Sequence, residues 1–340
     1  MIKYIFWEIT HRCNQRCGVC HLYGEESHTE LCEELSLEQN IMIIDKINKY
    51  FKGNVPRVKI SGGEPFLRKD LCYILQYLEK LEIPYGVMSN FSAISTKQID
   101  KFAELHPKFL NVSLDGPEFI HDKIRKCEGG YIKTLTALKR YLSLKKSEVS
   151  IELNCVMQLE NLNYYAHIID VAEELKVAVT FQHVNFLSRG EEKIQREYDN
   201  SILGLNHYRH YINNKNPFEK RKNIIKLNSI IQAIFDYAKK KNVEVKIKPA
   251  IINKDALDLY YLRKTIDSRN SCTEVGNMFF IEPNGDVNAC FERYKIGNLL
   301  SENLYHIMNK DVTQKLVSDL RKIDENPICK RCCKGDFTNY

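Results

Sequence analysis

Two kinds of apolar pattern alternate along the first 184 residues of the chain. In one, apolar residues recur every three or four positions, as at Leu37, Ile41, Ile44 and Ile47, which predicts a helix from Ser36, its N-cap, to residue 51. The same spacing predicts helices near residues 71–78, 95–105, 130–145 and 161–175. The other pattern is a short apolar run, and it predicts strands at residues 3–9, 57–60, 85–88, 109–114, 149–156 and 177–182.

This regular alternation predicts an α/β fold, because each helix supplies the crossover between two parallel strands. Six strands are fewer than the eight that close a barrel. We therefore expect an open, partial (β/α)6 barrel. Its functional residues should lie at the carboxyl ends of the strands, where the loops of such sheets meet.

The alternation fails after about residue 185. Polar and basic stretches at 189–196 and 213–226 surround a predicted helix at 224–241 and a strand at 243–247. The last section predicts a hairpin (278–281 and 287–290, with a turn at 283–285) and a helix near 311–323. The expected parts are a barrel core at 1–184, a divergent helical section at 185–271 that covers the barrel mouth, and a small C-terminal domain at 272–340.

Composition narrows the class of protein. The 340 residues are 44% hydrophobic and 28% charged, which is ordinary for a globular chain. The formal net charge of +6 is modest, and no basic stripe interleaved with aromatic residues indicates nucleic-acid binding. No apolar run reaches the roughly 18 residues of a membrane span, and the first residues lack the features of a signal peptide. We expect a cytoplasmic protein with no membrane partner.

Twelve cysteines are the strongest compositional signal. Eight of them fall into two groups, at 13–20 and 272–333, and in a chain without an export signal such groups favour metal ligands over disulfides. The other four are predicted to pack as small apolar side chains: Cys32, Cys72, Cys127 and Cys155.

The first group, Cys13, Cys17 and Cys20, follows the first predicted strand directly. Three thiolates can bind three irons of a [4Fe–4S] cluster and leave the fourth iron for an exogenous ligand. The alternative is a structural zinc site with His11 or His21 as its fourth ligand. Structural zinc favours two C-x2-C pairs separated by a longer loop, which this spacing does not match.

The run Thr10-x2-Cys13-Asn14-x2-Cys17-x2-Cys20 resembles the signature of the radical S-adenosylmethionine (SAM) superfamily. The resemblance implies that SAM chelates the open iron and is cleaved reductively to a 5′-deoxyadenosyl radical, which abstracts a hydrogen from the substrate. It also implies a reducing partner such as flavodoxin or ferredoxin. The family often has an aromatic residue before the last cysteine, where this chain has Val19.

Three strand ends carry further residues that resemble SAM contacts of the family. The turn after residues 57–60 resembles the motif for the SAM amino group, although alone it is also a common tight turn: Gly62, Gly63, Glu64 and Pro65. Ser89 and Asn90 close the next strand. A Ser-Leu-Asp-Gly run with a following His-Asp-x2-Arg places Ser113 and Arg125 at the SAM ribose and carboxylate, or, alternatively, in a strand cap and a surface salt bridge. Asn154 and Gln182 would face the same mouth.

The second group, Cys272-x17-Cys290 and Cys329-x2-Cys332-Cys333, resembles the twitch form of the SPASM domain. That form implies one auxiliary [4Fe–4S] cluster held by Cys272, Cys290, Cys329 and Cys332, with residues 296–299 as the usual return strand. Cys333 could replace Cys332, stay a free thiol or bind a different iron. A zinc ribbon is the alternative, although its first two cysteines would be two residues apart rather than seventeen.

The same resemblance implies a substrate class. Most relatives of this kind oxidise or cross-link side chains of ribosomally made peptides, and others are dehydrogenases or epimerases of sugars or aminocyclitols. Because the first strand begins at residue 3, no leader-binding module precedes it, so we expect either a separate leader-peptide-binding protein or a small substrate. A non-catalytic iron–sulfur electron carrier or zinc-binding scaffold remains the alternative of another class. The catalytic base cannot be named from the sequence.

Overall fold

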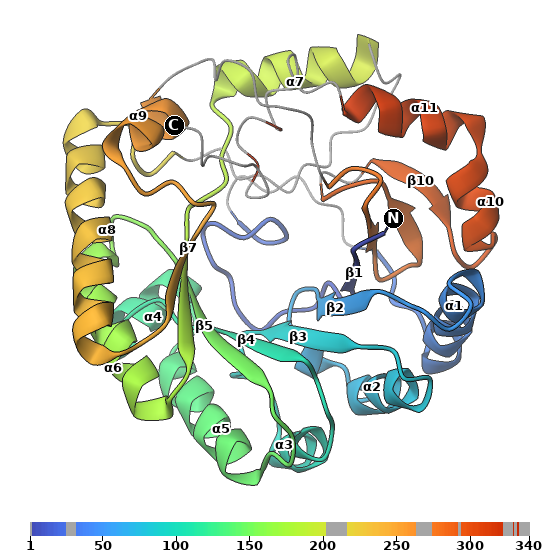
Figure 1. The fold of residues 1–340 in the computed structure, drawn as a ribbon, viewed down its shortest axis with the longest axis horizontal. Coiled ribbons are helices and arrows are strands. Elements are labelled where there is room, and N and C mark those ends of the chain that lie inside the picture. Colours follow the sequence, from blue (N-terminus) through green and yellow to red (C-terminus); the bar gives the residue numbers. More distant parts are fainter. Residues whose placement is uncertain are drawn as a thin grey trace.

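One curved sheet organises the molecule in a computed structural model that describes residues 2–24, 32–201, 216–262, 274–291, 294–321, 329 and 332. Its strand order is β10-β9-β8-β1-β2-β3-β4-β5-β6-β7. The helices cover the convex side of the sheet, and the loop that follows β1 lies on the concave side (Figure 1). The α/β fold with a parallel sheet that the sequence predicts is therefore confirmed.

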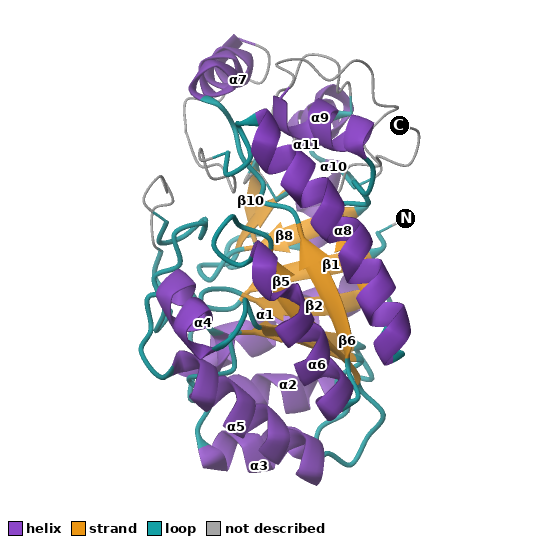
Figure 2. Cartoon of the chain, turned by 90° about the vertical axis from the view of Figure 1, so that its left-hand side faces the viewer, coloured by secondary structure: helices purple, strands orange, loops and turns teal. Residues whose placement is uncertain are grey.

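The barrel strands all pair in parallel with their neighbours. Their carboxyl ends meet at one edge, where a group of loops collects beside α4 (Figure 2). The elements from β1 to β6 are β1 Tyr4–Glu8, α1 Leu37–Tyr50, β2 Arg57–Ser61, a 3-10 turn Pro65–Leu67, α2 Leu71–Lys80, β3 Tyr85–Ser89, α3 Thr96–Ala103, β4 Phe109–Ser113, α4 Glu118–Arg125, α5 Gly130–Leu144, β5 Ser150–Val156, a 3-10 turn Leu162–Tyr164, α6 Tyr165–Leu175 and β6 Ala178–Gln182.

A seventh parallel strand, β7, extends this sheet beyond the six that the sequence predicts for the barrel. It pairs with β6 over Val179 to Gln182. The crossover that joins them is long, and its described part includes α7 and α8, so the short repeat of the first half is lost along this section. Its elements are α7 Arg189–Ser201, α8 Arg221–Lys241, β7 Val245–Lys248 and α9 Lys254–Leu262.

The predicted hairpin does not stand apart from the barrel, because β8 pairs in parallel with β1. Gly285 takes a φ of +84° in the turn, a conformation that favours glycine. The polar helix α7 lies across the open side of the sheet (Figure 1) and contacts this region, since Gln195 Nε2 donates to Tyr294 Oη at 3.2 Å. The remaining elements are β8 Met278–Ile281, β9 Asp286–Asn288, β10 Lys295–Asn298, α10 Leu304–Asn309 and α11 Asp311–Leu320.

Alternation along β1 assigns its side chains to two environments. Ile5 and Trp7 are fully buried in the core between the sheet and the helices. Tyr4 and Phe6 belong to a second apolar cluster together with Phe280. Because successive strand residues point to opposite faces, Glu8 lies on the same face as Tyr4 and Phe6. No helix in the described part of the chain is long and apolar enough to cross a membrane.

Candidate functional site

The three N-terminal cysteines lie on the loop after β1, each half-buried. Two of their sulfur atoms face backbone amides: Gln15 N is 3.4 Å from Cys13 Sγ, and Leu22 N is 3.4 Å from Cys20 Sγ. Arg16 N donates to the carbonyl of Arg125 at 3.0 Å, which fixes the loop to the end of α4. The loop thus presents three thiols at the carboxyl edge of the sheet.

Burial favours the protonated form of all three thiols in the absence of a metal. Burial raises the pKa of Cys13 to about 12 and also raises the pKa values of Cys17 and Cys20. The thiols therefore keep their protons at neutral pH until a metal displaces them. Within the described residues, the three sulfur atoms do not form a set with mutual distances within 4.8 Å, as ligands of a single ion do.

The Gly62-Gly63-Glu64 turn packs directly on the backbone that leads into this loop. Gly63 N donates to Thr10 O at 2.8 Å, and Glu64 N donates to Arg12 O at 2.7 Å. A Cβ on Gly62 would lie 2.2 Å from Thr10 O, and one on Gly63 would lie 2.2 Å from Arg12 O. The two glycines are needed for this close approach, and Pro65 then begins the 3-10 turn.

Glu64 is fully buried and joins the ends of β2 and β3. Its carboxylate accepts hydrogen bonds from Ser89 Oγ at 2.7 Å, Asn90 N at 2.7 Å and Phe66 N at 3.1 Å. Burial raises the pKa of Glu64, and these donors act against that rise. Glu64 thus ties the Gly62-Gly63 turn to the end of β3.

Asn90 extends the contact from β3 to the cysteine loop. Its Nδ2 atom donates to Asn14 Oδ1 at 2.9 Å and lies 3.9 Å from Cys13 Sγ. Ser89, in contrast, is occupied by Glu64 and by the amide of Phe91, which donates to Ser89 Oγ at 2.7 Å. The structure therefore places Ser89 behind Glu64 and Asn90 beside the first cysteine.

Arg125 forms a buried ion pair and not the surface salt bridge considered above. Its Nε is 2.5 Å from Asp115 Oδ2, and the exposed side-chain fractions are 12% and 1%. Burial disfavours the guanidinium charge, but Asp115 and Cys17 outweigh burial and raise the pKa of Arg125. Arg125 thus brings a fixed positive charge to the cysteine loop. Ser113 lies half-buried at the end of β4, opposite Asn154 of β5, and Gln182 ends β6.

Sequence reasoning missed the buried polar residues on the other side of the loop. Glu8 is fully buried, with Oε1 2.8 Å from His21 Nε2 and Oε2 3.2 Å from His11 Nε2. The Nε2 atoms of both histidines named in the zinc alternative therefore face a carboxylate. The available signal was the period-two pattern of β1, which places an acidic residue on the inner face after Tyr4 and Phe6.

The four scattered cysteines do not share one environment. Cys72 and Cys155 are buried, as predicted, and Cys127 is half-buried. Cys32 is also half-buried, and its Sγ lies 3.5 Å from His11 Nδ1, so its prediction as an apolar filler is wrong.

Among the auxiliary cysteines, the structure describes Cys290, Cys329 and Cys332, all half-buried. Cys290 follows β9, and Cys332 N donates to Cys329 O at 3.4 Å. Cys272 and Cys333 lie outside the described residues. The predicted ligand set of the auxiliary cluster therefore stays a prediction.

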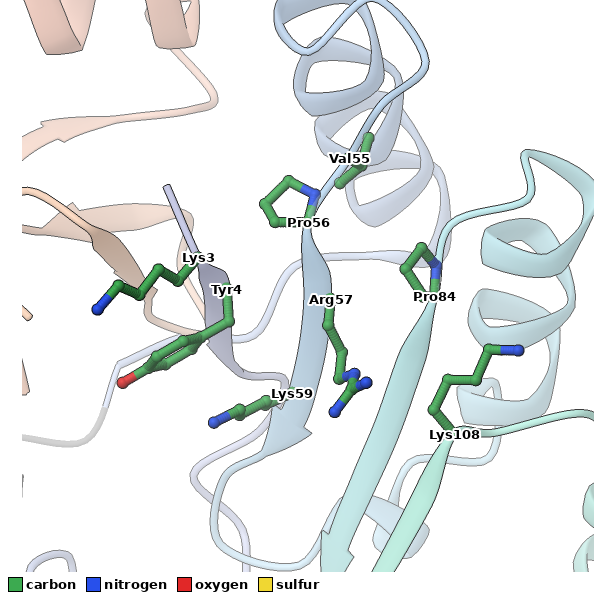
Figure 3. Close-up of a pocket in the computed structure, with 8 residues that line it drawn as sticks. All are labelled: Lys3, Tyr4, Val55, Pro56, Arg57, Lys59, Pro84 and Lys108. Carbon is green, nitrogen blue, oxygen red and sulfur yellow. The ribbon is translucent and has the colours of Figure 1, made fainter. Parts of the chain in front are cut away.

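A basic pocket of about 440 Å³ lies at the opposite edge of the sheet, where the strands begin (Figure 3). Its walls carry Lys3, Arg57, Lys59 and Lys108. Lys59 Nζ lies 3.8 Å from the centre of the Tyr4 ring, a cation–π contact. Because the cysteine loop is at the carboxyl ends of the strands, this pocket is separate from it.

Curated relatives match a little more than half of the chain. Fe-coproporphyrin III synthase of Methanosarcina barkeri is 27% identical over 57% of this chain and 47% of its own length. The sporulation killing factor maturation protein SkfB of Bacillus subtilis is 25% identical over 51% of this chain and 40% of its own length. The chain spans about half the length of the curated relatives it matches.

Solved structures share the fold over the whole chain. Streptococcus suis SuiB bound to S-adenosylmethionine has a TM-score of 0.67 and 17% identity over 100% of this chain and 74% of its own. SuiB bound to its precursor peptide SuiA has a TM-score of 0.66 and 16% identity over 100% and 72%.

Family models account for both cysteine groups. The model of the radical SAM superfamily matches residues 7–172, and the SPASM model, an iron–sulfur cluster-binding domain, matches residues 272–333. The matches include the first cysteine loop with the Gly62-Gly63 turn, and the span from Cys272 to Cys333. This chain belongs to the radical SAM superfamily and carries a SPASM domain, so it is a radical SAM enzyme whose cofactors are [4Fe–4S] clusters and S-adenosylmethionine.

Proposed function

We propose that this enzyme abstracts a hydrogen from a peptide side chain and so oxidises or cross-links it. The observation that carries the proposal is the packing of the Gly62-Gly63-Glu64 turn on residues 10–12, directly before Cys13. It brings a thiol trio and a buried carboxylate to one edge of the sheet. An electron carrier needs the thiols but not this carboxylate at their side.

Each group at that edge has a proposed task. Cys13, Cys17 and Cys20 hold the SAM-binding cluster, Glu64 and the Gly62-Gly63-Pro65 backbone bind the SAM ammonium group, and Asn90 positions Cys13. A reduced [4Fe–4S] cluster held there would supply the single electron that reductive cleavage of SAM needs. Arg125 binds the SAM carboxylate, which suits its fixed positive charge, and Ser113 binds the ribose. Ser89 holds Glu64 in place.

The proposed net reaction is a two-electron oxidation, which needs an electron acceptor beside the substrate. We assign that role to the auxiliary cluster at Cys272, Cys290, Cys329 and Cys332, with a protein base taking the proton. A flavodoxin or ferredoxin would supply the first electron. The section at 185–271 is proposed to meet the substrate, because α7 lies across the open side of the sheet (Figure 1).

The peptide substrate is supported by two similar proteins. SuiB is solved with its precursor peptide SuiA, and SkfB is a maturation protein of the sporulation killing factor. A small-molecule substrate is the second candidate, because Fe-coproporphyrin III synthase is 27% identical over 57% of this chain.

Anaerobic turnover tests the proposal. The enzyme, reconstituted with iron and sulfide, is incubated with SAM and dithionite, and 5′-deoxyadenosine is measured by mass spectrometry. We expect product from the wild type and from Cys72→Ala, a buried cysteine of α2, and none from Cys17→Ala. Absence of 5′-deoxyadenosine, or of a spectral change when SAM meets the reduced cluster, would contradict it.

The substrate class needs its own measurement. Peptides encoded beside the gene would be synthesised with deuterium at side-chain carbons and added to the same reaction. Deuterium in 5′-deoxyadenosine together with a peptide lighter by two hydrogens supports peptide oxidation. If deuterium is transferred from a labelled sugar, aminocyclitol or tetrapyrrole but from no peptide, the peptide proposal is wrong and the small-molecule substrate is favoured.

A further inference from the structure

A second group of possible metal ligands lies beside the cysteine loop. His11, Cys32 and Glu282 each contribute one donor atom, and these atoms lie within 4.8 Å of one another. They come from three segments that are distant in sequence: the loop after β1, the connection to α1 and the turn after β8. Of the residues that the structure describes, no other three histidine, cysteine or acidic side chains come this close.

The imidazole of His11 is oriented as a ligand would be. Its Nε2 atom faces Glu8 Oε2 at 3.2 Å, and because an ionised carboxylate only accepts, Nε2 carries the proton. The lone pair is then on Nδ1, which lies 3.5 Å from Cys32 Sγ. A histidine held by a carboxylate through its outer nitrogen is the usual arrangement around a protein-bound metal.

Glu282 is held in a similar way. Its Oε1 atom accepts a hydrogen bond from Asn288 Nδ2 of β9 at 2.9 Å. The pairing of Trp7 with Ile281 places Glu282 next to Glu8 at the ends of two parallel strands. Glu282 is 2% exposed and Glu8 is fully buried, so a divalent cation bound here would lie beside two buried carboxylates.

We propose that His11, Cys32 and Glu282 bind one divalent transition-metal ion, with Zn²⁺ as the best fit, at a site separate from the iron–sulfur clusters. Mixed nitrogen, sulfur and oxygen ligands suit zinc, and three protein ligands leave the fourth position for water. His11 Nδ1 accepts a hydrogen bond from Cys32 N at 3.2 Å. In the metal-bound protein, the same lone pair binds the ion instead. The ion fixes the loop that carries Cys13 to the β8–β9 turn.

The inference does not rest on the proposed function, and its test needs no turnover. Enzyme reconstituted with iron and sulfide is given one equivalent of zinc and desalted, its metals are counted by mass spectrometry, and the zinc is examined by X-ray absorption. We expect one zinc per chain with one sulfur at about 2.3 Å and nitrogen or oxygen at about 2.0–2.2 Å. Zinc bound in a cysteine cluster would show several sulfurs.

Variants connect the ion to these residues. Cys32→Ala and Glu282→Gln should each lose the zinc and keep the iron, and Cys72→Ala should keep both. Glu8→Gln should weaken zinc binding about 10–100-fold without abolishing it, because Glu8 supports His11 and is not itself a proposed ligand. Wild-type enzyme without zinc, zinc with two or more sulfurs, or zinc retained by both ligand variants would overturn the inference.

Discussion

Gly63 shows at the residue scale how the backbone positions the cysteine loop. An added methyl group would overlap the Arg12 carbonyl, which cannot move without moving Cys13. We predict that Gly63→Ala lowers the free energy of unfolding by about 1–3 kcal/mol and lowers the iron content of the first cluster. Denaturant unfolding and an iron assay measure the two effects.

Gly18 provides the matched control, since it lies in the same loop and an added Cβ would meet nothing within 4 Å. Gly18→Ala should keep both its stability and its iron content. Equal behaviour of the two variants would show that the overlap at Gly63 is relieved without disturbing the loop.

The buried pair of Asp115 and Arg125 gives a second residue-scale prediction. Asp115 also accepts a hydrogen bond from Val156 N at 3.1 Å, so it joins β5 to α4. Asp115→Asn leaves a buried guanidinium without its counter-charge, and we expect a loss of about 3–5 kcal/mol in unfolding free energy. Asp100→Asn, which breaks the exposed pair with Arg140, should cost less than about 1 kcal/mol. Similar losses for both variants would contradict the argument.

At the scale of elements, His183 connects the end of β6 to α9. Its Nδ1 atom accepts from Tyr261 Oη at 2.8 Å, and its Nε2 donates to Ile251 O at 3.0 Å. Burial lowers the pKa of His183 to about 4 from an ordinary value of 6.5. Below pH 6.5 the unfolded chain therefore binds a proton that the folded chain does not, and stability falls as the pH decreases.

We predict that His183→Gln flattens this dependence, because glutamine can keep both hydrogen bonds and does not titrate. Between pH 7.5 and 5.5 the wild type should lose about 1 kcal/mol more stability than the variant. His121, whose burial also lowers its pKa to about 4, contributes the same slope to both proteins. Urea unfolding at four pH values measures the difference, and parallel curves would contradict the prediction.

Elements with local signals were predictable from the sequence, and those that depend on distant contacts were not. Ser36 and Gln39 form the capping box at the start of α1, and both residues lie within one turn of the helix. In contrast, α7 has few apolar residues, so its pattern resembles a polar loop. The neighbourhood of Glu8 and Glu282 depends on β8 pairing with a strand more than 270 residues earlier, which no local pattern reveals.

The candidate site also has parts that the sequence predicts and parts that only the fold reveals. The spacing of Cys13, Cys17 and Cys20 and the Gly62-Gly63 turn are short motifs, so the sequence was sufficient to place them together. Other contacts depend on side chains from segments that are separate in the sequence. They are the hydrogen bond of Ser89 to Glu64, the ion pair of Asp115 with Arg125 and the contact of Cys32 with His11.

At the scale of the molecule, the β1–β8 pairing joins the barrel and the hairpin into one sheet. Phe6 and Phe280 stack across it with ring centroids 5.3 Å apart, and Phe291 packs against Phe6 at 4.9 Å. Phe280 is fully buried. Trp7, the single tryptophan, lies on β1 and pairs with Ile281 of β8, so its fluorescence reports on the strand that the barrel shares with the hairpin.

We predict that Phe280→Ala lowers the free energy of unfolding by about 3–5 kcal/mol. The unfolding midpoint should shift by the same amount in two spectroscopic measurements. Because the sheet is continuous, loss of the aromatic packing between β1 and β8 should destabilise the barrel helices as well, so far-ultraviolet circular dichroism and Trp7 fluorescence should shift equally. Phe119→Ala on α4, where the side chain is 62% exposed, should shift either probe by about 0.5 kcal/mol or less. Unequal shifts of the two probes would mean that the molecule does not unfold in a single cooperative step, and they would contradict this prediction.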